Sequence, residues 1–420
     1  MSCNRIRVFM VMQMRVAGRM LSDTCKGYLM RLLPTVLVVW TFASTCGFAD
    51  STGSPEPSLQ PAQLYLERLS AESGSPGVSA VVMVNGQVVF SGGVGVADLE
   101  SQEPQTGSTV HNIGSLSKTQ AVVAVMQLVE RGKVRLDAQI QEYAPWFPRK
   151  SQPITLRQIL THTSGIRHYK QGDFGPTGVN AFRHYDKFEE STQFWRDDPL
   201  LFEPGTHWAY SSYAVDLVQA VVESASGQTY ESYLTEHVSA PAGMVNTQLD
   251  LPARIVRHRG HGYVWNAKLG LMENAPNEDV SYKYAGGGVI SSDEDLVRFG
   301  HALNCGMLLR PETLAEMYRL QLPLDLPRFE DKTSPPIGAI QGLVFRIGKD
   351  ASRHGYTWHS GSVKGTTSEF LNYYADDVVI ALHFNYGSGP VDTVAAAHTL
   401  ADLYLPRKPA ASGRASSSRH

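Results

Sequence analysis

The chain has 420 residues, of which 42% are apolar, enough to build a substantial core as one large domain or two closely packed ones. Lys plus Arg total 37 against 40 Asp plus Glu, a formal net charge of −3, so no basic surplus points to nucleic acid and we expect no nucleic-acid partner. The apolar and charged contents are those of an ordinary globular protein and exclude a chain that is disordered throughout.

The first 49 residues are expected to be a targeting leader. Arg31 precedes an apolar run from Leu32 to Ala43, and small residues follow up to Ala49. This order is typical of a secretory signal, and the run is too short for a permanent membrane span. Residues 1–29, rich in Arg and poor in acidic side chains, would also suit a mitochondrial transit peptide. We therefore expect an exported protein, periplasmic or secreted, with a mitochondrial location as the alternative.

Composition divides the remaining chain into three parts. Residues 50–61 are rich in Pro and Ser and are expected to form a linker, and residues 406–420 are expected to form a disordered polar tail. Residues 62–405 form the expected folded domain, with a mainly helical subdomain at about 145–290.

The first elements of this domain are a helix and a hairpin. Leu64, Leu66 and Leu69 lie among polar residues, and this stretch up to Ser70 is expected to be an amphipathic helix. Residues 78–84 and 87–91 are two β-rich runs joined by Asn85-Gly86. Because Asn-Gly tolerates positive φ at both central positions, this pattern predicts a hairpin with a type I′ turn.

The later elements return to strands after a long helical region. Residues 115–300 are expected to be mostly helical, whereas Thr366–Tyr374 and Val378–Asn385 predict a second hairpin around Asp376-Asp377. An apolar helix at Val391–Tyr404 closes the chain. Strands from both ends of the sequence, with helices between them, predict an α+β fold with one antiparallel sheet flanked by helices and a helical insertion. We expect the active site at the join of sheet and insertion.

The first chemical motif is Gly114-Ser115-Leu116-Ser117-Lys118, which precedes a predicted helix from Thr119 to Arg131. Ser115 then lies near a helix N-terminus, whose unpaired N–H groups favour an oxyanion. Lys118, one turn later, can place its amine within hydrogen-bond reach of the Ser115 hydroxyl. Alternatively, Ser115 is an ordinary helix N-cap, and Ser-x-x-Lys is short enough to occur by chance.

Two further motifs follow in a definite order, Tyr210-Ser211-Ser212-Tyr213 and Trp358-His359-Ser360-Gly361-Ser362. With Ser115-x-x-Lys118 they resemble the serine hydrolases of the class C β-lactamase and penicillin-binding-protein type, over about residues 62–405. The resemblance implies a β-lactamase/transpeptidase-like fold. Other family-like segments are Leu160–Ile166, Pro241–Met244 and Ala285–Val289, and the segments Thr163–Tyr169 and Tyr282–Gly288 are most similar to the mitochondrial serine β-lactamase-like branch and its bacterial relatives.

The resemblance implies hydrolysis through an acyl-enzyme on Ser115. Lys118 and Tyr210 would jointly accept the proton of the Ser115 hydroxyl, and Tyr210 would then deliver that proton to the leaving group. The backbone N–H groups of Ser115 and Ser362 would form the oxyanion hole. The function that follows is cleavage of an amide or ester bond, of peptidase or esterase type.

Two departures from the family pattern bear on the substrate. Ser212 stands where the family usually has Asn, so it has a shorter reach and no amide donor. His359 stands where a Lys would hold a permanent charge, whereas histidine is largely neutral at pH 7 unless perturbed. Both lie beside Gly361 in the expected substrate-binding set and weaken the case for efficient β-lactam hydrolysis. A true β-lactamase or D-Ala-type peptidase, and a non-catalytic scaffold or sensor that keeps the fold, remain as alternatives.

The expected partner is a small-molecule or peptide substrate, with no cofactor and no metal. His258 and His261 flank a turn, but their spacing supplies no third metal ligand. Cys305 follows a helical stretch with no nearby histidine and is expected to be an inert thiol. The sequence leaves self-association open.

Overall fold

The computed structural model describes residues 59–170, 172–174, 182–330, 341–387 and 389–406. The expected leader, most of the expected linker and the tail from residue 407 lie outside the described residues. Helix α1 (Leu59–Ser73) begins inside the range 50–61 that the sequence assigned to a linker. Within the described ranges, no helix is both long and apolar enough to cross a membrane.

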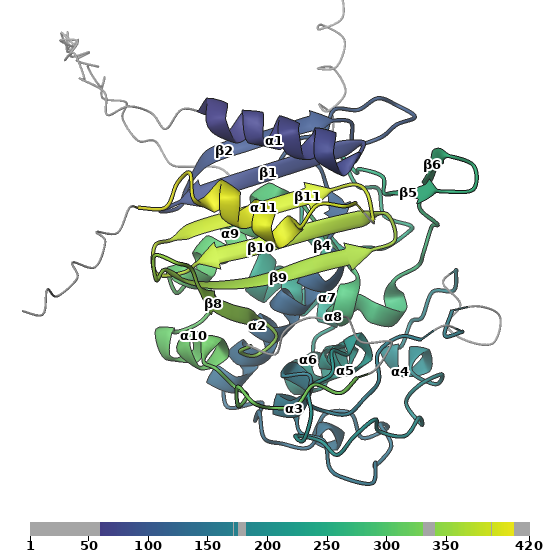
Figure 1. The fold of residues 1–420 in the computed structure, drawn as a ribbon. Coiled ribbons are helices and arrows are strands. Elements are labelled where there is room, and N and C mark those ends of the chain that lie inside the picture. Colours follow the sequence, from purple (N-terminus) through teal and green to yellow (C-terminus); the bar gives the residue numbers. More distant parts are fainter. Residues whose placement is uncertain (1–58, 171, 175–181, 331–340, 388, 407–420) are drawn as a thin grey trace, which may run out of the picture. The chain divides into compact units, whose positions relative to one another are not determined.

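The centre of the fold is a six-stranded antiparallel sheet in the order β2-β1-β11-β10-β9-β8. Its strands come from the two ends of the chain, which lie side by side in Figure 1. The α+β fold predicted from the sequence is confirmed. The strands of this sheet are β1 (Gly77–Val84), β2 (Gln87–Gly95), β8 (Arg346–Lys349), β9 (Gly355–Val363), β10 (Thr366–Tyr373) and β11 (Val378–Phe384).

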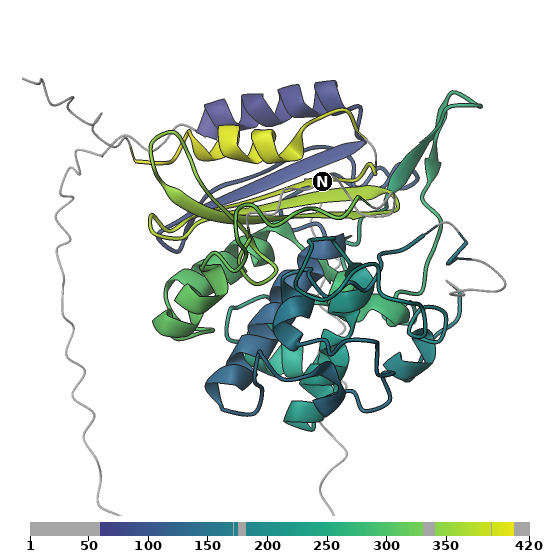
Figure 2. The same cartoon turned by 60° about the horizontal axis from the view of Figure 1, so that its bottom comes forward.

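Helices cover both faces of the sheet. Helices α1 and α11 (Thr393–Ala401) lie on one face, and the other face packs against α9 (Asp293–Asn304) and the helical region (Figures 1 and 2). The helical region contains α2 (Ser117–Glu130), α3 (Leu156–Leu160), α4 (Phe188–Ser191), α5 (Ser212–Asp216), α6 (Val218–Ser226), α7 (Tyr230–Leu234), α8 (Tyr284–Gly287) and α10 (Pro311–Tyr318). The smaller strands are β3 (His111–Asn112), β4 (Gln248–Leu249) and β7 (Val289–Ser291) in one sheet, and β5 (Tyr263–Asn266) and β6 (Leu271–Asn274) in another.

Burial on both faces explains why β1 and β11 are largely apolar. Along β1, Val78, Ala80 and Val82 pack with α1 and α11, whereas Val81 and Met83 face the core shared with α2 and α9. Successive side chains of a strand point to opposite faces, so a strand covered on both sides favours apolar residues at most of its positions. Each such side chain contributes about 1.5–3 kcal/mol by leaving water.

The hairpins predicted from the sequence are confirmed. Asn85 and Gly86 have φ of 49° and 76°, as a type I′ turn requires, and they join β1 to β2. Strands β10 and β11 pair in register, with Leu371 opposite Ile380. The terminal helix is shorter than expected, because α11 covers only Thr393–Ala401.

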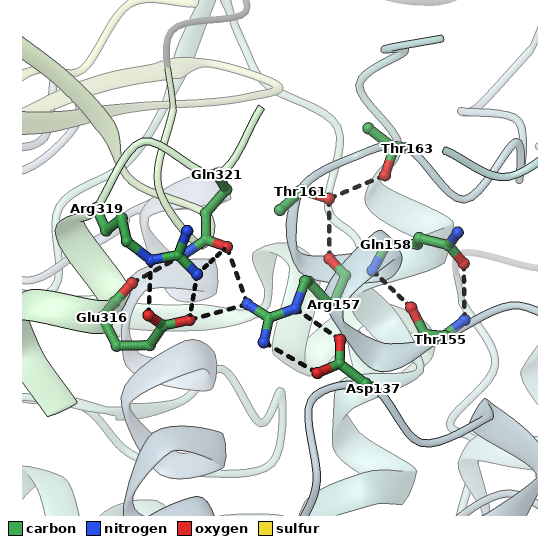
Figure 3. Close-up of polar contacts among 9 residues, drawn as sticks. All are labelled: Asp137, Thr155, Arg157, Gln158, Thr161, Thr163, Glu316, Arg319 and Gln321. Carbon is green, nitrogen blue, oxygen red and sulfur yellow. Dashed lines mark hydrogen bonds and ion pairs between the residues drawn. The ribbon is translucent and has the colours of Figure 1, made fainter. Parts of the chain in front are cut away.

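A polar cluster ties α3 to the segment that contains α10 (Figure 3). Arg157 on α3 donates to Asp137 at 2.7 Å, to Glu316 on α10 at 2.9 Å and to Gln321 at 2.9 Å. Thr155 and Gln158 form a capping box that fixes the start of α3. The loop after α3, which carries part of the site, therefore leaves from an anchored helix.

Candidate active site

Ser115 lies in a single 3₁₀ turn, Gly114–Leu116, directly before α2. The helix begins at Ser117, two residues earlier than the predicted start at Thr119, and Ser115 is half-buried at its entrance. Asn112 Oδ1 accepts the Gly114 N–H at 2.9 Å, and Ser117 Oγ donates to the Gly114 carbonyl at 2.7 Å. These bonds fix the turn, so the Ser115 hydroxyl has a defined position.

Lys118 is completely buried one turn along α2. Its Nζ donates to Ser115 Oγ at 2.9 Å and to the carbonyl oxygen of Gly286 on α8. Burying a charged amine is costly unless its hydrogen bonds are made inside the protein. The contact with Gly286 therefore holds the amine beside the serine.

Tyr210 comes from the loop that precedes α5 and reaches the same point. Lys118 Nζ lies 5.2 Å from the Tyr210 ring centroid, and interactions with Lys118 and Ser115 are among the causes that lower the pKa of Tyr210. The loop is set by Ser211, whose Oγ accepts the Ala214 N–H at 3.1 Å and so caps α5. The structure thus brings Ser115, Lys118 and Tyr210 together, with Lys118 in contact with both of the others.

Two cations act on the phenol of Tyr210. Burial alone raises the pKa of Tyr210, but the charges of Lys118 and Arg346 outweigh burial and lower it below its ordinary value. Arg346 on β8 is 4% exposed, its Cζ lies 5.9 Å from the Tyr210 ring, and its Nε and Nη1 have no hydrogen-bond partner within the described residues. No motif marks Arg346 in the sequence, because its nearness to Tyr210 arises only when β8 joins the sheet.

His162, which follows the C-terminal end of α3, also packs on Tyr210. Its ring centroid lies 4.4 Å from that of Tyr210, and its Nδ1 accepts the Ser211 N–H at 3.3 Å. Burial, followed by the charge of Lys118, lowers the pKa of His162 well below its usual range. A neutral, packed histidine therefore supports the loop that carries Tyr210.

The strand β9 approaches the serine turn at two glycines. A Cβ on Gly361 would lie 1.9 Å from the Ile113 carbonyl oxygen, and a Cβ on Gly114 would lie 2.9 Å from the Ser362 nitrogen. Gly114 also has φ of +52°, which favours glycine. This close approach brings the backbone at Ser115 and the backbone at Ser362 together, as an oxyanion hole requires.

His359 and Ser212, the other predicted binding residues, border the same group. His359 is 1% exposed, its ring centroid is 6.4 Å from that of Tyr210, and its Nδ1–H donates to the Ser360 carbonyl at 2.7 Å. Burial, then Arg346 and Lys118, lowers the pKa of His359 well below its usual range, so it is neutral at pH 7. Ser212 is 3% exposed and opens α5. Neither residue brings a positive charge.

A cavity of ≈ 580 Å³ is lined in part by Asn112 and Val363, which are close in sequence to the serine turn and to Ser362. We call it the polar cavity, because Asn112, Asp250, Arg259 and Lys364 are among its lining residues. Lys364 is exposed at this cavity, with Nζ 5.6 Å from the Phe174 ring centroid.

An antiparallel sheet covered by helices, with a Ser-x-x-Lys turn where the sheet meets a helical insertion, defines a β-lactamase/transpeptidase-like protein. A family model described as Beta-lactamase matches residues 63–405. The chain belongs to this family, as the sequence motifs predicted.

Curated relatives agree with this assignment. The human serine beta-lactamase-like protein LACTB, mitochondrial, is 28% identical over 396 residues, which cover 75% of this chain and 72% of the relative. Esterase EstB of Burkholderia gladioli is 30% identical over 277 residues, 58% of this chain and 69% of the esterase.

Solved structures show the same fold. An octameric penicillin-binding protein homologue from Pyrococcus abyssi matches with a TM-score of 0.69 at 23% identity, covering 82% of this chain and 77% of that one. A D-stereospecific amidohydrolase from Streptomyces sp. matches with a TM-score of 0.66 at 22% identity, covering 81% of this chain and 98% of that one. The fold is therefore shared with proteins that carry amidohydrolase and penicillin-binding names.

The close approach of β9 to the serine turn can be tested with G361A. Its new Cβ meets backbone at 1.9 Å, so β9 must move, and we expect the free energy of unfolding to fall by about 1–3 kcal/mol. Gly287→Ala is the matched control, because its Cβ would meet nothing closer than 3.8 Å. Denaturant unfolding measures both variants. Equal stability of the two would contradict the close packing.

Proposed function

We propose that the protein is a serine hydrolase that cleaves an amide or ester bond through an acyl-enzyme on Ser115. The observation that carries the proposal is the 2.9 Å hydrogen bond from Lys118 Nζ to Ser115 Oγ, with Tyr210 packed against the same amine. A serine hydroxyl in contact with a lysine, beside a tyrosine whose own pKa is lowered, has the parts needed for its activation.

In the proposed reaction, Ser115 Oγ attacks the substrate carbonyl carbon while its proton passes to the Lys118/Tyr210 pair. The lowered pKa of Tyr210 supports its part as proton acceptor. The same proton then goes to the leaving group as the amide or ester bond breaks. The N–H groups of Ser115 and Ser362 stabilise the oxyanion, a contribution of about 2.7–4 kcal/mol for each donor. Water then attacks the acyl-enzyme, which releases Ser115.

The proposed substrates are peptide-like amides or esters rather than β-lactams. His359 is buried and neutral, and Ser212 has no amide donor. The polar cavity offers both acidic and basic side chains, including Asp250 and Arg259. The names of esterase and amidohydrolase relatives are consistent with this choice. True β-lactamase or D-Ala-type peptidase activity is the alternative within the same chemistry, and a nitrocefin assay beside a panel of peptide amides and esters distinguishes them.

For location, we propose export, with a mitochondrial address as the alternative that the names of the LACTB relatives favour. The two addresses differ in where the leader is cut, so N-terminal sequencing of the mature protein decides between them. We propose no cofactor and no metal, and within the described ranges no group of three or more His, Cys, Asp or Glu side chains could hold a metal ion.

Covalent labelling tests the proposed nucleophile. We expect a fluorophosphonate probe to form a stoichiometric adduct at Ser115, because the probe reacts with an activated hydroxyl. Intact mass and peptide mapping measure the adduct. Ser115→Ala is the negative control. Folded wild-type protein without an adduct would favour the non-catalytic scaffold.

Substitution of the partners tests the proposed proton transfer. We expect Tyr210→Phe to slow labelling of Ser115 by about 10²–10⁴-fold, because the ring is kept and only the hydroxyl is lost. Lys118→Met should abolish labelling, since it removes the donor to Ser115 Oγ. The matched control is Tyr373→Phe, a buried tyrosine on the opposite face of the sheet whose hydroxyl contacts His398. Labelling of Y210F at the wild-type rate would refute the role of Tyr210.

A further inference from the structure

Asp216 is a buried carboxyl close to the catalytic group. It is the last residue of α5, six positions after Tyr210, and it is 1% exposed. Its Oδ1 has no hydrogen-bond partner within the described residues by distance and angle, and its Oδ2 accepts a long bond, 3.5 Å, from the Tyr169 hydroxyl. A carboxyl placed in this way needs a compensating charge or a proton.

Asp216 and Lys118 lie against the same residue of α8. Lys118 Nζ donates to the Gly286 carbonyl, and the Gly286 backbone N–H faces the Asp216 carboxyl. A Cβ on Gly286 would lie 2.1 Å from Asp216 Oδ1, so only glycine allows the carboxyl to pack here. A single residue, Gly286, therefore lies between the carboxyl and the amine: its N–H faces Asp216 and its carbonyl accepts from Lys118.

Lys118 is the cation that can compensate a negative charge on Asp216. Lys283 also faces Asp216, but it is ion-paired with Glu278 at 3.0 Å. Lys118 has no carboxylate within 4.0 Å among the described residues, so its charge is not already compensated there. The remaining titratable groups around Asp216 are phenols from the α3 loop, α5, α7 and the turn before α8, namely Tyr169, Tyr213, Tyr230 and Tyr282.

We propose that Asp216 is a positioning residue whose carboxylate, across the Gly286 peptide, holds Lys118 as an ammonium ion and so assigns the Ser115 proton to Tyr210. This inference rests on the proposed function and divides the roles of its two proton-accepting groups. In the step, the Ser115 O–H proton moves to the Tyr210 phenolate oxygen as Oγ bonds to the carbonyl carbon. Lys118 stays protonated throughout and stabilises the phenolate.

Because Asp216 titrates, the proposed role makes the rate of Ser115 acylation depend on pH. Burial raises the pKa of Asp216 to about 7, against the opposing influence of Lys118. Below this pH the carboxyl is protonated and exerts no charge on Lys118, and above it the carboxylate is formed. Acylation by the Tyr210 route therefore rises as the pH passes about 7.

The test compares wild type with Asp216→Asn, which keeps the shape and removes the charge. The rate of fluorophosphonate labelling at Ser115 is measured from about pH 5 to about pH 9. We expect the ionisation near 7 to disappear in D216N and the rate on the alkaline side to fall by about tenfold, equivalent to one pKa unit of lost charge stabilisation. The matched control is Asp293→Asn, a buried aspartate of raised pKa that contacts Ser79 and does not face Lys118.

A second measurement keeps the proposal testable without any variant. In wild-type protein labelled at lysine Nζ with ¹⁵N, we expect the Lys118 signal to report an ammonium ion above the Asp216 ionisation. A neutral amine there, or a D216N profile identical to wild type, would overturn the role of Asp216. Either result leaves Ser115 labelling and the proposed function intact, whereas an unlabelled wild-type Ser115 would remove the proposed function itself.

Discussion

The burial of Lys118 is the constraint on which the site depends. A lysine with no exposure needs its hydrogen bonds supplied by the protein, and they come from Ser115 on its own helix and from Gly286 on α8. The serine turn, α2 and α8 must therefore keep their mutual positions for the amine to keep its hydrogen bonds to Ser115 and Gly286. The same requirement that stabilises the core holds the hydroxyl in place.

The sheet contributes to the site mainly because the backbone of β9 packs closely against the backbone of the serine turn. Gly361 and Gly114 let β9 and the serine turn meet at distances that a Cβ would forbid, and the Ser115 and Ser362 backbones come together as a result. Tyr210 arrives from the other side, on a loop capped by Ser211. The site is thus assembled from three parts of the chain that the fold alone brings together.

Local patterns predicted the elements and motifs well, because hairpins and helices depend on neighbouring residues. Asn85-Gly86 sets its turn through φ alone, and the apolar run after Lys118 defines α2. The motif order also identified Ser115, Lys118 and Tyr210 as one group. Arg346 and Asp216 escaped the sequence analysis, because their proximity to this group is created by strand pairing and helix packing, which no local pattern encodes.

These two residues also set the electrostatics of the site. His359 on β9 is neutral, and the positive charge near Tyr210 comes instead from Arg346 on the adjacent strand β8. The register pairs Arg346 with Trp358, whose ring centroid lies 4.7 Å from the guanidinium carbon. Near Lys118, Asp216 is a buried carboxyl whose pKa is raised to about 7 by burial. A phenol near two cations loses its proton more readily, so the pKa of Tyr210 lies below its ordinary value despite its burial.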